Sequence, residues 1–327
     1  MSPASNGAAG ANGGNGVKKP GILLRVRPRG FCAGVVRAVD IVELAIEAYG
    51  PPVYVHHEIV HNRHVVEQLR RRGAIFVESM SDVPDGSVLI FSAHGVPPRL
   101  REEAEARKLR VIDATCPLVT KVHLEAQKFA REGRTIVLIG HRDHQEIVGT
   151  SGEAPLQTVV VGSVEEVDEL VVPDPERLAF LTQTTLSLYD TQEIVERLKQ
   201  RFPQILGPKS SDICYATQNR QDAVRLLAGQ VDLVLVVGSA SSSNSNRLRE
   251  LAAKQGVPAH LIDGPESIDP AWLTGARRVG LTAGASAPEE LVRAVIAHLR
   301  DAGASAIHEL DGTAETIAFA LPRELRV

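Results

Sequence analysis

The amino-acid sequence predicts an α/β protein whose parallel sheets are covered by helices on both faces. Short apolar runs alternate with longer amphipathic stretches along nearly the whole chain. Most of these runs are apolar at every position rather than at every second one, which is typical of strands buried on both faces. A hydrophobic fraction of 43% over 327 residues is enough for a large core and excludes a disordered chain.

The expected elements follow one another in a regular order. Short runs rich in Val, Ile and Leu predict strands, and stretches with apolar residues three and four positions apart predict helices. The expected strands cover residues 22–26, 53–55, 88–91, 110–113, 135–139, 159–161, 178–181, 233–237, 260–262 and 278–281. The expected helices cover residues 35–49, 99–107, 119–131, 188–201, 218–228, 246–255 and 289–299.

Charge, cysteine content and the N-terminal segment narrow the class of protein. A balance of 36 basic and 40 acidic side chains argues against a nucleic-acid coat or a polybasic membrane anchor. No apolar run approaches the roughly 18 residues that span a bilayer. Three cysteines cannot form a disulfide framework, so we expect a reduced, cytoplasmic protein. Residues 1–20, rich in Gly, Ala, Asn and Ser without the apolar segment of a secretory signal, predict a disordered tail.

The same few polar residue types, Cys, His, Ser, Thr and Asn, follow eight of the expected strands. A single polar residue at such a position is usually no more than a helix N-cap. Ligands of parallel α/β sheets, however, bind outside the carboxyl ends of the strands, so the repetition indicates a shared site. The residues are Cys32, His94, Cys116, His141, His144, Thr184, Cys214, Ser242, Asn244 and Ser286.

The three cysteines divide the chain into thirds, since they lie 84 and 98 residues apart. Each precedes an expected helix, and a helix N-terminus favours the thiolate, which is the form that binds metal. Three converging thiolates could hold zinc with an open position, or an iron–sulfur cluster with one iron that lacks a protein ligand. The residues alone do not separate these two cofactors. A catalytic nucleophile would explain only one of the three.

Histidines and hydroxyl groups supply the remaining candidates. The segment GHRDHQE places Glu146 beside His141 and His144, and a desolvated carboxyl group can donate a proton near neutral pH. The segment HHEIVHNRH over residues 56–64 suggests a metal clip, although it lacks the HExxH arrangement. SSSNSN, ASAP and TQTT offer hydroxyls, amides and helix N-termini, which suit a diphosphate even though no P-loop motif occurs.

Eight segments taken together resemble the family of 4-hydroxy-3-methylbut-2-enyl diphosphate reductases. The resemblance extends over residues 22–327, and the order of the motifs makes it far more specific than any one of them. The segments are RGFCAGVVRAVDIVE, HEIVHNRHVVEQL, FSAHGV, DATCPLVTKVH, TQTTLS, DICYATQNRQDAV, VVGSASSSNSNRL and TAGASAPEEL.

This resemblance implies a trefoil of three related α/β units around a central 4Fe–4S cluster. The units would cover residues 21–116, 117–210 and 211–300, with residues 301–327 folding back over the body. The matching cysteines, Cys32, Cys116 and Cys214, would be the cluster ligands.

The resemblance also implies the substrate pocket and the chemistry. The diphosphate would be held by His61, His94, His144, Ser242, Ser243, Asn244 and Ser286. Glu146 and Thr184 would deliver protons while two electrons, from reduced ferredoxin or flavodoxin, remove the substrate's hydroxyl group as water. The products would be isopentenyl and dimethylallyl diphosphate. Gln145 departs from the family pattern, which commonly has a proline there to stiffen the loop before Glu146.

Three other functions compete with this one. A dehydrating enzyme similar to quinolinate synthase would also use three cysteines and a cluster, but it would need no external electrons. A redox or iron sensor would need a nucleic-acid or protein interaction surface, and the sequence holds no basic stripe or DNA-reading module. A simple zinc protein would contain no sulfide.

Overall fold

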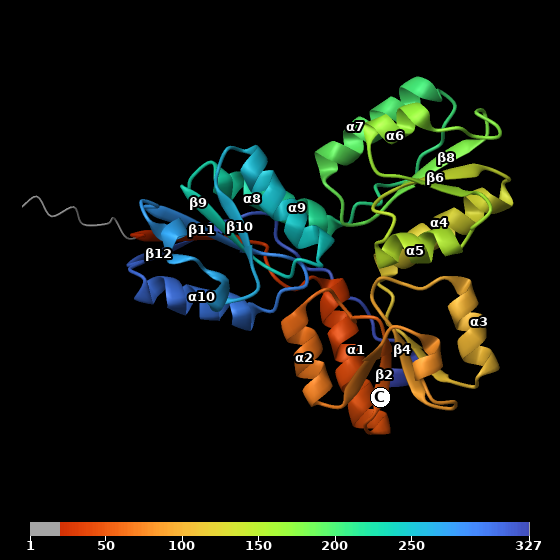
Figure 1. Ribbon diagram of the computed structural model, residues 1–327, viewed down its shortest axis with the longest axis horizontal. Coiled ribbons are helices and arrows are strands. Elements are labelled where there is room, and N and C mark those ends of the chain that lie inside the picture. The colour runs from red at the N-terminus through yellow and green to blue at the C-terminus, as the bar shows by residue number, and fades with distance from the viewer. Residues whose placement is uncertain (1–19, 327) are drawn as a thin grey trace, which may run out of the picture.

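The computed structural model describes residues 20–326, so the tail expected over residues 1–20 falls outside it except for Pro20. The described chain forms three parallel sheets, each flanked by helices, in three lobes that meet at the centre (Figure 1). The predicted α/β class is therefore confirmed.

The first sheet has the strand order β3-β2-β4-β5, and all its pairings are parallel. Its strands are β2 (Val53–His56), β3 (Ala74–Val77), β4 (Val88–Phe91) and β5 (Arg110–Asp113). The accompanying helices are α1 (Ala33–Tyr49), α2 (Arg63–Arg71) and α3 (Pro98–Ala106), with a 3₁₀ turn over Met80–Asp82.

The second sheet has the order β7-β6-β8 and is also parallel. Its strands are β6 (Thr135–Ile139), β7 (Thr158–Val161) and β8 (Leu178–Thr182). The accompanying helices are α4 (Pro117–Arg131), α5 (Gln145–Gly152), α6 (Val164–Glu169) and α7 (Leu188–Arg201).

The third sheet has five parallel strands in the order β10-β9-β11-β1-β12. They are β1 (Ile22–Arg27), β9 (Leu233–Val237), β10 (Ala259–Ile262), β11 (Arg278–Ala283) and β12 (Ala306–Asp311). The accompanying helices are α8 (Tyr215–Ala228), α9 (Ser243–Lys254) and α10 (Glu289–Asp301). Three further 3₁₀ turns cover Pro265–Ser267, Pro270–Leu273 and Arg323–Leu325.

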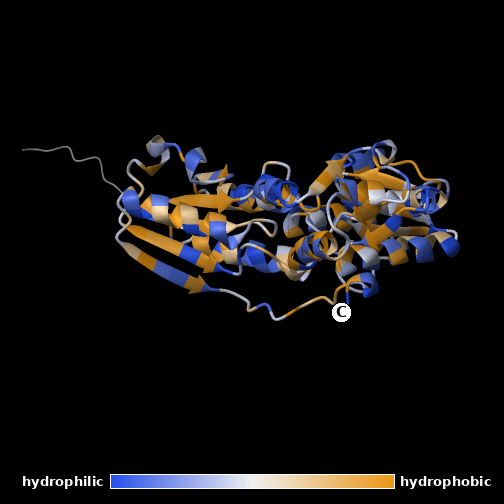
Figure 2. Cartoon of the chain, turned by 90° about the horizontal axis from the view of Figure 1, so that it is seen from below, coloured by the Kyte–Doolittle hydropathy of each residue, from blue (hydrophilic) through white to orange (hydrophobic). Residues whose placement is uncertain are grey.

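Burial on both faces explains why the strands are apolar at every position. In β9, Leu233 and Leu235 pack into one hydrophobic cluster, whereas Val234 and Val236 pack into another on the opposite face. Figure 2 shows the strands mostly in the apolar colour, while the helices carry both colours because one side of each faces solvent.

The first strand does not lie in the unit that its position in the sequence suggested. The sequence placed residues 21–116 in one unit, but β1 pairs in parallel with β11 and β12 and so belongs to the third sheet. Strand pairing joins segments almost 300 residues apart here, and no local pattern specifies such a partner. β12 was absent from the expected strands because half of AIHELD is polar, as is common in an edge strand.

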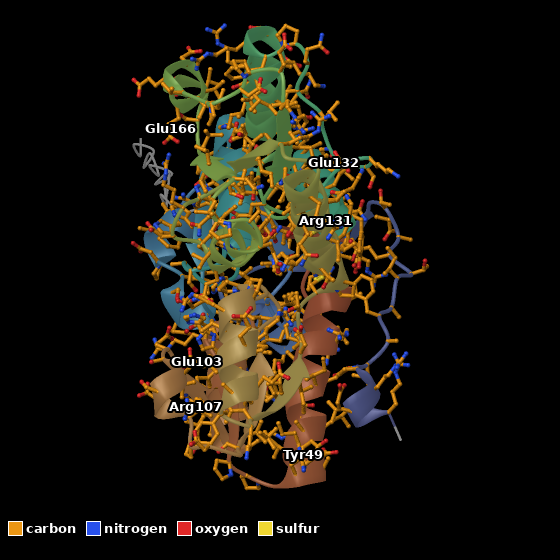
Figure 3. The ribbon with its side chains drawn as sticks, turned by 90° about the vertical axis from the view of Figure 1, so that its right-hand side faces the viewer. Tyr49, Glu103, Arg107, Arg131, Glu132 and Glu166 are labelled. Carbon is orange, nitrogen blue, oxygen red and sulfur yellow. The ribbon has the colours of Figure 1, made fainter. Side chains whose placement is uncertain are left out.

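Beyond β12 the chain crosses to the first unit. Leu321 and Leu325 pack against the core of that unit, and the hydroxyl group of Tyr49 donates a hydrogen bond to the carbonyl of Glu324 at 3.4 Å. Tyr49 lies at the outer end of α1, next to these C-terminal residues (Figure 3). Among residues 20–326, no helix combines the length and the apolar character that a membrane crossing requires.

Candidate active site

Each of the three cysteines is the N-cap residue of a helix. Cys32 precedes α1, Cys116 precedes α4 and Cys214 precedes α8. All three line the same cavity, although they come from three different parts of the chain. The partial positive charge at a helix N-terminus stabilises a thiolate, so three helices direct a favourable potential at the same place.

Burial makes two of these thiols poor acids in the absence of a positive partner. It raises the pKa of Cys116 to about 12 and that of Cys214 to about 11, and the neighbouring cysteine sulfurs add to the rise. Three adjacent thiolates would therefore repel one another unless a cationic group lay between them. A metal centre supplies that charge, so the donor set fits a thiolate-bound metal group.

Two interactions hold the cysteine segments in place. The Arg220 side chain, which is completely buried on α8, donates hydrogen bonds to the carbonyl of Gly30 at 2.7 Å and 3.2 Å. Its charge is paired with Glu315 at 2.9 Å. Because Gly30 lies just before Cys32 and Arg220 lies on the helix that Cys214 begins, this arginine joins two of the cysteine segments to the C-terminal segment.

A cavity of about 110 Å³ is lined by all the residues that the motif resemblance implies as ligands, pocket residues or proton donors. They are Cys32, His61, His94, Cys116, His144, Glu146, Thr184, Cys214, Ser242, Ser243, Asn244 and Ser286. None of the lining residues in the described part of the chain is a lysine or an arginine.

Three histidines form one wall of this cavity. The rings of His61 and His94 stack with centroids 4.0 Å apart, and the ring of His144 lies edge-on to both. Burial lowers the pKa of His144 to about 3 and lowers that of His94 well below its ordinary value, because a charged ring would be desolvated. Nδ1 of His144 accepts a hydrogen bond from the backbone N–H of Glu146 at 3.2 Å, so its single ring proton lies on Nε2.

Hydroxyl and amide groups from the third unit form the facing wall. Ser242 is the N-cap of α9, and its hydroxyl oxygen accepts a hydrogen bond from the backbone N–H of Ser245. Asn244 uses its Oδ1 to accept a hydrogen bond from the backbone N–H of Ala285 at 2.9 Å. The Ser286 hydroxyl donates to the carbonyl of His61 at 2.9 Å, which joins the two walls.

Two buried polar atoms in this cavity are left without a protein partner. Within residues 20–326, neither Nδ2 of Asn244 nor Nε2 of His61 has a hydrogen-bond partner, although both atoms are buried. A buried polar atom without a partner is costly, so these two groups indicate the place of a polar ligand.

Glu146 lies between the histidine wall and the cysteines. It is 2% exposed, and burial raises its pKa to about 7 even though hydrogen bonds from Thr184 oppose that rise. The backbone N–H of Thr184 donates to Oε1 at 2.6 Å, and the Thr184 hydroxyl lies 3.0 Å from Oε2. Since Oε1 must accept from the N–H, the acidic proton of the neutral carboxyl lies on Oε2.

Other histidines that the sequence singled out lie outside this cavity. His57 pairs with Glu78 and His64 pairs with Glu290 near the surface, so the 56–64 segment contributes His61 but forms no metal clip. His141 does not line the cavity either.

Gly34, Thr185 and Thr217 line the cavity but were absent from the residues chosen from the sequence. Gly34 and Thr217 lie within three residues of a cysteine in the sequence, and this short spacing could have identified them as residues of the site.

The motif resemblance is supported by known proteins. A family model described as LytB protein matches residues 23–300 of this chain. The chain belongs to the LytB family. A LytB relative in Ralstonia nicotianae, named 4-hydroxy-3-methylbut-2-enyl diphosphate reductase, is 58% identical over 93% of this chain and 94% of its own length. The protein of the same name in Pseudomonas putida is 58% identical over 92% of this chain and 96% of its own.

Solved LytB structures share the fold. The E-1-hydroxy-2-methyl-but-2-enyl-4-diphosphate reductase of Plasmodium falciparum superposes with a TM-score of 0.91 at 43% identity, covering 94% of this chain and 97% of that one. A second structure has a TM-score of 0.63 at 31% identity, with 86% and 99% covered. It is described as (E)-4-hydroxy-3-methyl-but-2-enyl diphosphate reductase, the terminal enzyme of the non-mevalonate pathway. The expected trefoil of three α/β units is consistent with both.

Replacement of Gly34 by alanine tests how tightly the cysteines are packed. A Cβ atom at this position would lie 2.7 Å from Sγ of Cys116 and 3.8 Å from Sγ of Cys32. Overpacking costs about 1–3 kcal/mol, which exceeds the roughly 1 kcal/mol that alanine gains over glycine in a helix. We expect Gly34→Ala to bind markedly less iron per chain than the unmodified protein after anaerobic reconstitution.

The matched control is Gly229→Ala, at the end of α8, where φ is −68° and a Cβ would meet open space. This variant should keep its full iron content. Equal iron content in both variants would show that a methyl group at position 34 fits beside the cysteine sulfurs.

Proposed function

We propose that this protein is a 4-hydroxy-3-methylbut-2-enyl diphosphate reductase of the reduced cytoplasm. The observation that carries the proposal is one cavity in which three N-cap cysteines lie beside a buried carboxyl group and a set of histidine, serine and asparagine side chains. The reaction breaks the substrate's C–O bond, uses two electrons and two protons, and releases water with isopentenyl and dimethylallyl diphosphate.

Cys32, Cys116 and Cys214 would hold a 4Fe–4S cluster. When bound, this cluster supplies electrons one at a time and an iron that lacks a protein ligand. The chain supplies three cysteines and no fourth, which is the number that a 4Fe–4S cluster with one open iron requires.

The histidine wall and the N-terminus of α9 would bind the diphosphate. Nδ2 of Asn244 is a buried donor that a phosphate oxygen would satisfy. Nδ1 of His61 lies 3.2 Å from the Glu58 carboxylate, so Nε2 of His61 would donate to a phosphate oxygen in the doubly protonated ring. The N-termini of α5 and α9, which begin after His144 and Ser242, add the favourable potential that anions find at helix ends. Asparagine, serine and histidine side chains and helix N-termini would thus bind the diphosphate in place of the lysine and arginine side chains of many phosphate sites.

Glu146 would deliver the proton that leaves with the substrate's oxygen. Its raised pKa keeps a large share of the carboxyl groups protonated near pH 7. With the acidic proton on Oε2, the Thr184 hydroxyl 3.0 Å away can accept it and pass its own proton into the cavity. Thr184 also accepts a hydrogen bond at its carbonyl from the backbone N–H of Cys214, which keeps the proton donor and that cysteine in register.

Anaerobic purification followed by iron, sulfide and zinc analysis tests the cofactor, and turnover of the diphosphate with reduced ferredoxin or flavodoxin tests the reaction. We expect iron and sulfide in equal amounts and turnover only with a reductant. Turnover without electrons would indicate a dehydrating enzyme. A colourless protein with one zinc and no sulfide would overturn the proposal.

Removal of either unpartnered donor is expected to weaken substrate binding. His61→Ala and Asn244→Ala each delete a hydrogen bond to a charged phosphate oxygen, which contributes roughly 1.5–3 kcal/mol. The dissociation constant should therefore rise about 10- to 150-fold, measured by calorimetry under anaerobic conditions. His64→Ala is the matched control, because that ring pairs with Glu290 away from the cavity. Unchanged affinity in the first two variants would remove both residues from the diphosphate site.

A further inference from the structure

The sulfur of Cys214 makes two hydrogen bonds with the first turn of α8, and both are with Thr217. The backbone N–H of Thr217 lies 3.3 Å from Sγ, and the Thr217 hydroxyl oxygen lies 3.1 Å from it. Thr217 is 1% exposed and lines the cavity, so water does not compete for this contact.

The other two cysteines lack this arrangement. Neither Cys32 nor Cys116 caps its helix through a side-chain hydrogen bond, whereas Cys214 does. Thr120, four residues after Cys116, turns its hydroxyl group to the carbonyl of Cys116 at 3.3 Å instead of to the sulfur. The three sulfurs are therefore inequivalent, and within residues 20–326 a buried hydroxyl group contacts Cys214 alone.

The direction of the hydroxyl hydrogen bond follows from the state of the sulfur. A metal-bound thiolate carries no proton, so the hydroxyl group of Thr217 must be the donor when Cys214 is a ligand. Hydrogen bonds to cluster sulfurs stabilise the more negative, reduced state and so raise the reduction potential. The effect is strong in a dry site, where the hydrogen bond is not screened.

We infer that Thr217 is a positioning residue that sets the reduction potential of the cluster through its hydroxyl hydrogen bond to Cys214. The inference rests on the proposed function, since it requires Cys214 to be a cluster ligand. A residue that only caps the helix needs its backbone N–H alone, whereas a residue that sets the reduction potential also needs the hydroxyl proton. Removal of the hydroxyl group therefore separates the two roles.

The test compares Thr217→Val with Thr217→Ser in the anaerobically reconstituted full-length protein. Valine keeps the shape and the backbone N–H but removes the hydroxyl group, while serine keeps the hydroxyl group. Redox titration followed by electron paramagnetic resonance should give Thr217→Val a more negative potential than the unmodified protein at equal iron and sulfide content. Thr217→Ser should stay close to the unmodified protein, and so should the matched control Thr120→Val.

Several results would overturn the inference. A potential in Thr217→Val equal to that of the unmodified protein would do so, as would an equal shift in the serine variant. If the valine variant does not bind the cluster, a measurement on the unmodified protein tests the inference instead. Its reduced cluster, measured by electron–nuclear double resonance after exchange into D₂O, should show two exchangeable protons near a sulfur, and the absence of the hydroxyl proton would refute the inference.

Failure of the proposed function would look different. In that case the unmodified protein would bind no iron–sulfur cluster at all, and the inference would fall with it. A cluster of normal content whose potential ignores the Thr217 hydroxyl would refute only the inference.

Discussion

Replacement of Cys32, Cys116 or Cys214 by serine, one at a time, is expected to abolish turnover and to lower the iron content sharply. The chain has only three cysteines, so no spare thiolate can take over a lost ligand. Each cysteine also begins a different helix, so the loss of one ligand releases one side of the centre and the binding energy that joins the three units. Iron and sulfide analysis together with single-substrate turnover would measure both effects.

The control for these variants separates loss of a ligand from loss of a helix cap. Ser163 caps α6 by accepting a hydrogen bond from the backbone N–H of Glu166, outside the cavity. Ser163→Ala should lose about 1 kcal/mol of stability and no iron. A cysteine variant that kept its full iron content and near-normal turnover would not have lost a ligand.

Glu146→Gln is expected to lower kcat by about 10²–10⁴, which is the range for a positioned general acid. Glutamine keeps the size of the side chain and most of its hydrogen bonds, but it has no acidic proton to donate. Substrate affinity and cluster absorbance should stay near those of the unmodified protein, because neither depends on the acid. Steady-state kinetics under anaerobic conditions, with a calorimetric measure of affinity, would separate the two effects.

Two further variants sharpen this result. Thr184→Val removes the hydroxyl group that lies 3.0 Å from Oε2 but leaves the acid, so its loss of kcat should be smaller. Glu166→Gln, which replaces a partly exposed carboxylate paired with Arg142 outside the cavity, should leave kcat unchanged. If Glu146→Gln turned over within about threefold of the unmodified protein, the carboxyl group would serve only to order its loop, since threefold is far below the effect of a general acid.

The raised pKa of Glu146 also predicts how kcat depends on pH. Burial raises this pKa to about 7, so the carboxyl group is protonated and able to donate below that pH. As the pH rises through 7 the group ionises, and kcat should then fall by up to about tenfold per pH unit. The same titration should be missing from the pH profile of Glu146→Gln. If Glu146→Gln and the unmodified protein had the same pH profile, the titration would belong to another group.

Most secondary structure could be predicted because it depends on neighbouring residues. The helix expected over residues 188–201 has the same bounds as α7, and every expected strand is present. The elements that the sequence missed, α2, α5, α6, β3 and β12, are short or carry polar residues on the side that tertiary packing leaves exposed. A local pattern is too weak in such segments to distinguish an element from a loop.

The candidate site could be predicted because its side chains lie where strands end and helices begin. Cys32, Cys116 and Cys214 were expected to precede helices, and all three do. The motif resemblance added the partners of these cysteines, since spacing alone could not say that segments 84 and 98 residues apart would converge.

The sequence by itself determined the α/β class, the helices that the cysteines begin and the set of candidate site residues, because each of these depends on local composition and motif. Only the tertiary structure decided that β1 joins the third sheet, that burial raises the pKa of Glu146 to about 7, and that, in the part of the chain described, a hydroxyl group contacts Cys214 but neither of the other cysteines. Strand partners, desolvation and side-chain contacts all depend on residues distant in the chain, so they exist only once the three units have come together.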